Sequence, residues 1–435
     1  MVIPPILARR DAAGFWLTVL LTGIGTGLGA SALTELLELV QHTLWSGNGI
    51  DLLQAACRAA AWKHLVILLG AGLLTGAGQL LVVRLSAANS IDITAAIWFH
   101  AGRLPTLRTL GSAMLSILVV GMGASLGREG APKQTGAVIA NVMSDRVRLS
   151  DEQRRLLVAC GSGAGMAAAY GVPLGGALFA LEVLRGERAL RFVLPALLTS
   201  LIATGVSWAF LPNAPTYLIP PYTGTLGSMV WALLAGPIIG LASVGYVRAV
   251  AWVDHHRPSG PRRLAASAIT LTLLGAISIV FPQLLGNGRD IAQLAFTGQV
   301  APLLLLSLLL LKPAATLLCL GSGTPGGLFT PSLAIGALLG GLLGVPFAHA
   351  WPGTAPGLFA VLGATALLAA TTQGPLSATV LMMELTGQAR AFIVPMLLIV
   401  ALATLIARTI EPRSIYDARL SDAEVLKRQR QRDPV

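Results

Sequence analysis

Long apolar runs separated by short polar loops dominate the chain. Residues 313–383 contain no Asp, Glu, Lys or Arg, whereas a helix that crosses a bilayer needs only about 20 apolar residues. Further spans are predicted at residues 15–34, 64–83, 106–126, 156–181, 192–211, 228–247, 264–287 and 391–407. The pattern therefore predicts an all-α, polytopic membrane protein, with one integral membrane domain over residues 1–435.

Glycine and proline interrupt many of these runs; the chain has 49 Gly and 25 Pro. We expect breaks at residues 161–163 (GSG), 171–173 (GVP) and 321–327 (GSGTPGG). Non-helical backbone at membrane depth is tolerated only where it is buried in protein or lines a cavity. The sequence thus predicts a bundle of tilted and broken helices, and paired breaks of this kind point to the binding site of a transporter.

The two halves of the chain resemble each other. PLGG at 173–176 precedes Glu182, and PLSA at 375–378 precedes Glu384, with the glutamate nine residues after the proline in both halves. The alternative is chance similarity between segments rich in Gly, Ala and Leu. We predict a duplication. The sequence alone does not give the relative orientation of the two repeats, and we take them as inverted. The predicted parts are a first repeat over 14–185, a second over 190–410, and a last helix with a short basic tail over 411–435.

The net charge of +11 comes from basic residues in short loops and tails, at 9–10, 146–155, 257–263 and 427–432. Such an excess is typical of cytoplasmic loops. It predicts a multi-pass protein of the cell (inner) membrane with both termini in the cytoplasm and no nucleic-acid partner. The cysteines (Cys57, Cys160 and Cys319) are far apart in sequence and two lie in apolar runs, so their pattern fits neither a zinc site nor a disulfide framework and indicates buried packing. No cofactor or metal is expected.

Glu129 lies in the motif GREGAP at 127–132, between two stretches without charge. A carboxylate at membrane depth is costly, so it marks a functional site by default. The glycines suggest exposed backbone amides at the start of a helix, where an anion or a carboxylate binds. The alternative for Glu129 is an ion pair with Arg128 or Lys133 at a helix end.

Three motifs together resemble the CLC family of chloride channels and chloride/proton antiporters. GREG at 127–130 matches the family's GREGP element, although the proline comes one place late. GSGTPGGLFTP at 321–331 is similar to the GGxFxP element, and SIY at 414–416 resembles the tyrosine-bearing start of the last helix. The resemblance extends from about residue 15 to 420. It implies transport of chloride or a similar small anion by a lipid-embedded homodimer with one pore in each subunit.

The resemblance also implies roles for particular residues. Glu129 is the expected gate, because its carboxylate can occupy an anion position until it is protonated. Backbone amides give anion binding that still permits release, whereas a full positive charge in the pore would hold the anion too tightly. The expected ligands are Leu328, Phe329 and the Tyr416 hydroxyl for a central anion, and Gly130, Phe329 and Thr330 for a more external one. The alternative for Tyr416 is an interfacial aromatic anchor.

Two basic residues are candidate modulators of the gate. Lys133 is foreign to the family motif and lies one helical turn after Glu129. It would hold the Glu129 carboxylate deprotonated or attract anions to the pore mouth, unless it extends to the surface. Arg128 is the second candidate, with a structural role as the alternative.

The first filter element of the family, GSGIP, has no clean match. Asn89 is the candidate for the pore serine, with Ala88 and Ser90 as alternatives, and Asp92 is expected to cap the following helix. A preference for nitrate or fluoride over chloride therefore stays open.

Val183 occupies the position where the family's antiporters usually carry an internal proton-relay glutamate. Valine cannot carry a proton, so the sequence favours channel-like or weakly proton-coupled transport, with a chloride/proton antiporter as a close alternative. Glu182 and Glu384 are expected to be structural. A remote alternative is an intramembrane enzyme that uses Ser162 or Ser322, which lie between glycines; no histidine is placed as their base, and enzymatic activity is not expected.

Overall fold

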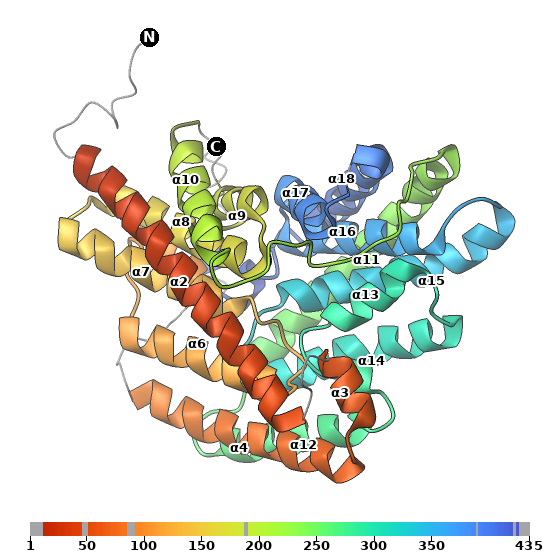
Figure 1. Cartoon of the computed structure of the whole chain (residues 1–435), viewed down its shortest axis with the longest axis horizontal. Coiled ribbons are helices and arrows are strands. Elements are labelled where there is room, and N and C mark those ends of the chain that lie inside the picture. The colour runs from red at the N-terminus through yellow and green to blue at the C-terminus, as the bar shows by residue number, and fades with distance from the viewer. Residues whose placement is uncertain are drawn as a thin grey trace.

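The computed structural model describes residues 12–45, 51–84, 92–186, 190–388, 390–420 and 423–425. In this part of the chain all the regular elements are helices (Figure 1). The α-helices are α2 (Ala12–Trp45), α3 (Leu52–Arg58), α4 (Ala61–Arg84), α5 (Ile93–Phe99), α6 (Thr106–Gly121), α7 (Gly130–Val147), α8 (Asp151–Tyr170), α9 (Pro173–Phe179), α10 (Leu190–Ser207), α11 (Leu226–His255), α12 (Arg262–Ser278), α13 (Arg289–Thr297), α14 (Pro302–Gly321), α15 (Phe329–Ala350), α16 (Pro356–Thr372), α17 (Pro375–Thr386) and α18 (Ile393–Ile410). Short turns of other helix types are η1 (Ala180–Arg185), η2 (Pro282–Leu284), η3 (Arg390–Phe392) and η4 (Asp417–Arg419).

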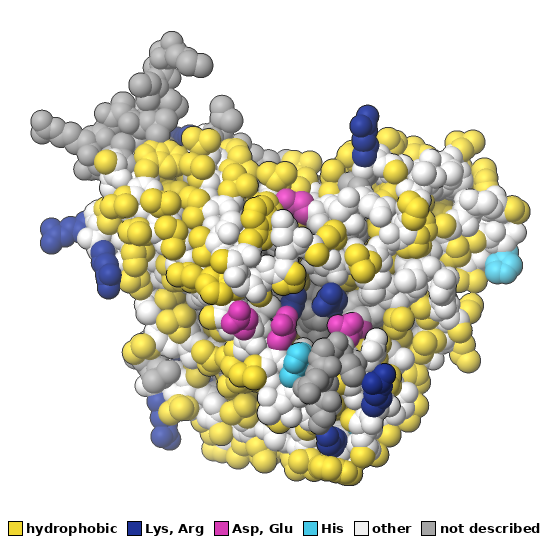
Figure 2. Space-filling view, in the orientation of Figure 1, with side chains coloured by type: hydrophobic (Ala, Val, Ile, Leu, Met, Phe, Trp, Pro, Cys, Tyr) yellow, Lys and Arg dark blue, Asp and Glu magenta, His cyan; other side chains and the backbone are white. Residues whose placement is uncertain are grey.

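The helices form the tilted bundle of a polytopic membrane protein, as predicted. Among the described residues, six helices are long and apolar enough to cross a membrane, and three more are shorter and apolar. The longest, α2, crosses the molecule obliquely, and α4 packs beside α12 at one end of the view in Figure 1. Figure 2 shows a largely hydrophobic surface in which acidic, basic and histidine side chains gather near the centre of one face.

The breaks expected at 171–173 and 321–327 are confirmed. Helix α8 ends at Gly171, whose φ of +68° favours glycine, and Pro173 opens α9. Helix α14 ends at Gly321 and α15 starts at Phe329. The span predicted at 264–287 is too long, because α12 ends at Ser278, shortly before Pro282, and only the short turn η2 follows.

The break expected at 161–163 is wrong, because α8 runs without interruption from Asp151 to Tyr170. Its glycines serve close packing between helices instead. A Cβ atom on Gly161 would collide with the backbone of Gly136 in α7, and one on Gly163 would collide with the backbone of Gly176 in α9. Small residues at such contacts let helix backbones approach closely within a membrane.

Equivalent contacts recur in the two halves of the chain. Gly336 in α15 packs against Gly363 in α16 as Gly136 packs against Gly161. The duplication over 14–185 and 190–410 stays a prediction, and these matched contacts support it.

Glu384 and Glu182 each accept hydrogen bonds at the N-terminus of a helix from the other half of the chain. The Glu384 carboxylate on α17 accepts hydrogen bonds from the backbone N–H groups of Leu174 (3.0 Å) and Gly175 (2.7 Å) in α9. The Glu182 carboxylate accepts one from the N–H of Ser377 in α17, at 2.7 Å. Both contacts satisfy N–H groups that have no partner within their own helix, which agrees with the structural role expected for these acids.

Glu384→Ala is expected to lower the melting temperature of the detergent-solubilised protein. The substitution leaves two N–H groups of α9 without their acceptor, at a cost of about 1–3 kcal/mol. Thermal unfolding of the purified protein measures the effect. Glu35→Ala, which removes an exposed carboxylate from α2, is the matched control, and an equal melting temperature for the two variants would contradict the capping role.

Candidate anion site

The starts of α7 and α15 meet through two glycines. The Gly127 N–H donates to the Gly327 carbonyl at 2.8 Å, and the Gly327 N–H donates to the Gly127 carbonyl at 2.7 Å. This pair of hydrogen bonds forms an isolated antiparallel bridge. Because the N-terminus of a helix carries unpaired N–H groups and partial positive charge, the bridge brings two electropositive helix starts to one place.

The Glu129 side chain fills the space between these helix starts and is fully buried. Its Oε1 accepts hydrogen bonds from the backbone N–H groups of Phe329 (2.7 Å) and Thr330 (3.3 Å). Its Oε2 accepts from the hydroxyls of Thr330 (3.1 Å) and Tyr170 (3.4 Å). A Cβ atom on Gly127 or Gly327 would collide with this carboxylate, so Glu129 can take this position only when both residues are glycine.

The carboxylate thus binds two of the three amides that the family resemblance implies for the external anion, those of Phe329 and Thr330 but not that of Gly130. None of the ion pairs in the described part of the chain involves Glu129, so the ion-pair alternative is not what the structure shows. Tyr170 was not singled out from the sequence. Its hydroxyl hydrogen-bonds to Thr330 at 3.0 Å as well as to Glu129, and it closes the site from α8.

Two cavities approach Glu129. The first, called here the Arg128 cavity, measures about 220 Å³ and is lined by Leu37, Glu38, Gln41, His42, Asp51, Leu52, Val120, Arg128, Leu285, Gly286, Asn287, Arg289 and Asp290. The second, the Tyr416 cavity, measures about 370 Å³; its lining includes Arg108, Gly130, Lys133, Ser162, Leu328 and Tyr416. Arg128, the residue before Glu129, lines the first cavity, and Gly130, the residue after it, lines the second.

Arg128 lines the first cavity and packs against Tyr170, one of the residues that contact Glu129. Its guanidinium lies 5.0 Å from the centre of the Tyr170 ring, a cation–π distance. Arg128 therefore holds the tyrosine whose hydroxyl contacts Glu129 and places a positive charge in the cavity wall.

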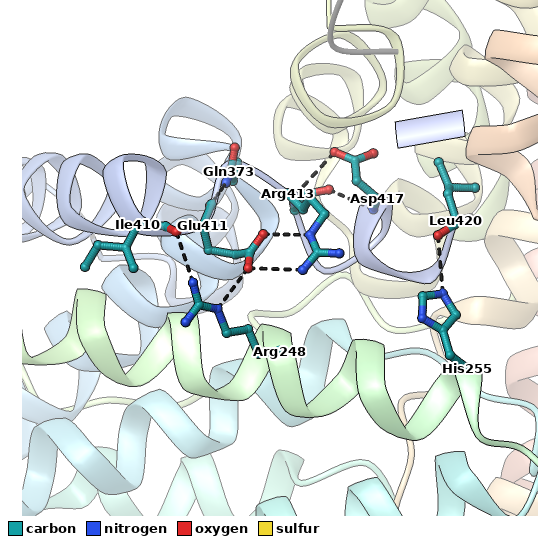
Figure 3. Close-up of polar contacts among 9 residues, drawn as sticks. Arg248, His255, Gln373, Ile410, Glu411, Arg413, Asp417 and Leu420 are labelled. Carbon is teal, nitrogen blue, oxygen red and sulfur yellow. Dashed lines mark hydrogen bonds and ion pairs between the residues drawn. The ribbon is translucent and has the colours of Figure 1, made fainter. Parts of the chain in front are cut away.

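A polar network holds the segment that carries Tyr416 (Figure 3). The Glu411 carboxylate accepts from Arg248 Nε at 3.0 Å and from Arg413 Nε at 2.7 Å. The Gln373 side chain donates to the Glu411 carbonyl at 2.8 Å. The sequence analysis did not predict this network, although two charged residues, Glu411 and Arg413, follow an apolar span directly. The Tyr416 ring then packs edge-on against Phe179, with centroids 5.8 Å apart.

The model of the family described as "Voltage gated chloride channel" matches residues 79–408. The chain belongs to this family. It is 32% identical to "Putative chloride channel protein ClcB-like" of Ralstonia nicotianae, over 82% of this chain and 86% of that protein. It is 30% identical to "H(+)/Cl(-) exchange transporter ClcA" of Vibrio parahaemolyticus, over 69% and 67%. The crystal structure of "a slow cyanobacterial Cl-/H+ antiporter" shares its fold, with a TM-score of 0.82 at 23% identity and coverage of 96% and 97%.

Lys133 lies inside this CLC protein, and its expected influence on Glu129 or on anions at the pore mouth stays a prediction. Its side chain is 6% exposed, so it does not extend to the surface. The ammonium donates to the Tyr416 hydroxyl at 3.3 Å and lies 4.6 Å from the Tyr416 ring centre and 5.0 Å from that of Phe179. Lys133 therefore lines the Tyr416 cavity, whereas Arg128 lines the other one.

Ala88, Asn89 and Ser90 lie outside the described residues, so their assignment to the filter stays a prediction. The expectation for Asp92 is confirmed, since its side chain accepts a hydrogen bond from the Ala95 N–H at 2.9 Å and caps α5.

Val183 is buried in η1, next to Glu182. The Glu182 carboxylate is engaged by the start of α17. For the enzyme alternative, Ser162 lines the Tyr416 cavity, but no histidine is among the lining residues. The Ser322 hydroxyl donates to the Cys319 carbonyl, three residues earlier in the chain, at 2.8 Å.

The anchoring of the Tyr416 segment is expected to weaken in acid. Burial acts to raise the pKa of Glu411, but hydrogen bonds from Arg413 and Arg248 and the charge of Arg413 outweigh it, so this pKa lies below its ordinary value of 4.5. A lowered pKa in the folded state stabilises the fold above the unfolded-state value, and this contribution is lost as the pH falls through the folded-state value. The difference in melting temperature between the wild type and Glu411→Gln should be greatest at neutral pH and shrink below pH about 4. A difference that stays constant with pH would contradict the role of the ionised carboxylate.

Proposed function

We propose that this protein moves chloride or a similar small anion across the membrane and that Glu129 is its gate. The observation that carries the proposal is the position of the buried Glu129 carboxylate on the N–H groups of Phe329 and Thr330. The residues on either side of it in the chain line two different cavities. Helix N-termini favour negative charge, so the carboxylate stands where a permeating anion would bind.

The gate works by competition between two anions for the same donors. Ionised Glu129 holds the amides and closes the connection between the Arg128 and Tyr416 cavities. Protonation removes the charge and weakens its hydrogen bonds, because charge-assisted bonds are roughly twice as strong as neutral ones. A mobile anion then takes the donors, and partial charges let it leave again.

Transport is channel-like or weakly coupled to protons, because Val183 offers no proton-carrying group and Glu182 is engaged at a helix start. The chloride/proton antiporter is the second candidate. It is favoured by the 30% identity to the exchange transporter ClcA.

The Tyr416 cavity faces the cytoplasm in this proposal. Its lining includes Arg108, Arg257, Arg263 and Arg419, which suits the cytoplasmic side by the positive-inside rule. Both termini lie in the cytoplasm, the membrane is the bacterial inner membrane, and the protein is a homodimer with one pore per subunit. The choice among chloride, nitrate and fluoride depends on the filter segment with Asn89.

Glu129→Gln is expected to keep anion flux while abolishing its acceleration at low pH and any coupled proton movement. The amide keeps the size of the side chain but removes the charge that competes for the donors. Reconstituted protein under a chloride gradient, with chloride release and external pH recorded together, measures both fluxes. Anion release at neutral pH should rise about tenfold or more, since losing one charge-assisted bond weakens closure by about 1.5–3 kcal/mol.

Glu35→Gln is the matched control for this experiment, because Glu35 is an exposed carboxylate on α2. It should behave as the wild type. Proton movement that persists in Glu129→Gln would overturn the gate assignment, and wild-type liposomes no more permeable to chloride, nitrate or fluoride than empty ones would overturn the transport proposal.

Val183→Glu is expected to increase the number of protons moved per anion, because it restores a titratable group at the relay position. Val183→Gln, similar in size and without a titratable proton, is the control. The same paired recordings measure the ratio, with thermal unfolding as a check on the buried acid. Equal ratios for the two variants would contradict the relay role of this position.

A further inference from the structure

The Tyr416 cavity contains a fixed positive charge at the place where sequence analysis expected only backbone amides and a hydroxyl. We propose that the Lys133 ammonium is a direct ligand of the transported anion, which binds in this cavity between Lys133 and the Tyr416 hydroxyl. The inference rests on the proposed anion transport and adds a specificity-determining residue to it. The ligand class is a small monovalent anion such as a halide.

The first argument is the position of Lys133 at the start of α7. It is the fourth residue of α7, whose first residue, Gly130, lines the same cavity. The side chain is 6% exposed, so the ammonium has lost most of its water. Burying a charge without compensation costs several kcal/mol.

The second argument is that the neighbours of the ammonium compensate its charge only in part. It lies over the Phe179 and Tyr416 rings and donates one hydrogen bond to the Tyr416 hydroxyl. An ammonium has three N–H donors. No carboxylate of the described residues forms an ion pair with it. An anion in the cavity would supply the missing negative charge.

The acids that line the same cavity are committed elsewhere. Asp254 pairs with Arg257 and with Arg419. Asp92 caps α5 through the Ala95 N–H. The charges of Asp92 and of Glu129, one helical turn before Lys133, do act on the ammonium through space. No ion pair of the described residues occupies its N–H donors, so a mobile anion can still bind to them.

The third argument is the state of the Tyr416 hydroxyl. It accepts its hydrogen bond from Lys133, so its own O–H proton is free for an acceptor in the cavity. A hydroxyl that accepts from a cation also becomes a better donor, because linked hydrogen bonds polarise one another. Lys133 and Tyr416 thus form a two-donor cradle, with Gly130 and Leu328 in the same wall.

A charged ligand should make anion binding tighter than dipoles alone would. The test is isothermal titration of sodium chloride and sodium bromide into the purified protein, with Lys133→Met and Lys133→Arg as variants. Lys133→Met keeps an unbranched side chain without the charge and should raise the Kd for halide about tenfold or more. Lys133→Arg should recover most of the affinity, which separates loss of charge from loss of packing.

Arg263→Gln is the matched control. Arg263 lines the same cavity but donates to the Pro258 carbonyl at 2.9 Å, with no contact to Tyr416 given by the structure. Its removal should change the Kd less than about twofold, since it acts only as a screened charge at a distance. An equal loss of affinity in Arg263→Gln and Lys133→Met would overturn the assignment in favour of a general field effect.

A second measurement uses the wild type and does not depend on folding of a variant. Crystals soaked in bromide should show an anomalous peak about 3.2–3.5 Å from the Lys133 Nζ. Bromide peaks with none beside Lys133, or halide affinity unchanged in a folded Lys133→Met, would overturn the proposal. Wild-type anion flux distinguishes the two failures: if flux is present, only the Lys133 assignment falls, and if it is absent, the proposed function falls as well.

Discussion

The backbone pairing of Gly127 with Gly327 is the contact on which the site depends. Two helix starts that each carry partial positive charge would not approach within a membrane unless something satisfied their N–H groups. The two reciprocal hydrogen bonds tie the segments together, and the Glu129 carboxylate neutralises the amides beyond them. Because neither glycine has room for a Cβ atom, the same geometry that joins the helices also fixes the position of the carboxylate.

Close packing of small residues supports this arrangement from behind. Helix α7 lies backbone to backbone against α8 at Gly136 and Gly161, and α15 lies against α16 at Gly336 and Gly363. Because no side chain separates the backbones at these contacts, the helices that carry the site pack directly against their neighbours. The site is therefore built from the ends of helices that pack closely through their glycines. Hydrogen bonds to Glu411 hold the segment that carries Tyr416.

Two positively charged side chains lie near Glu129, each beside an aromatic ring. Arg128 stands on one side against Tyr170, and Lys133 stands on the other against Tyr416 and Phe179. In both places an aromatic face accompanies the cation and lowers the cost of burying it. Partial charges of amides suit rapid exchange of an anion, whereas a full ammonium charge suits retention. In the proposed site, the rate at which the anion leaves is then a compromise between the two.

The helical membrane class, most of the spans and the breaks at 171–173 and 321–327 follow from the sequence, because apolar run length, proline and φ-positive glycine act locally. The motif with Glu129 and the amides of Phe329 and Thr330 could also be recognised there, although their roles stay predictions. The tertiary structure decided the rest. Glycines 161 and 163 have the same local preference whether they break a helix or pack it, and only the neighbouring α7 and α9 made them packing residues. Likewise the sequence placed Lys133 one turn after Glu129, but the partner that gives it a role, Tyr416, is 283 residues away, and contacts at such separation arise only when the chain folds.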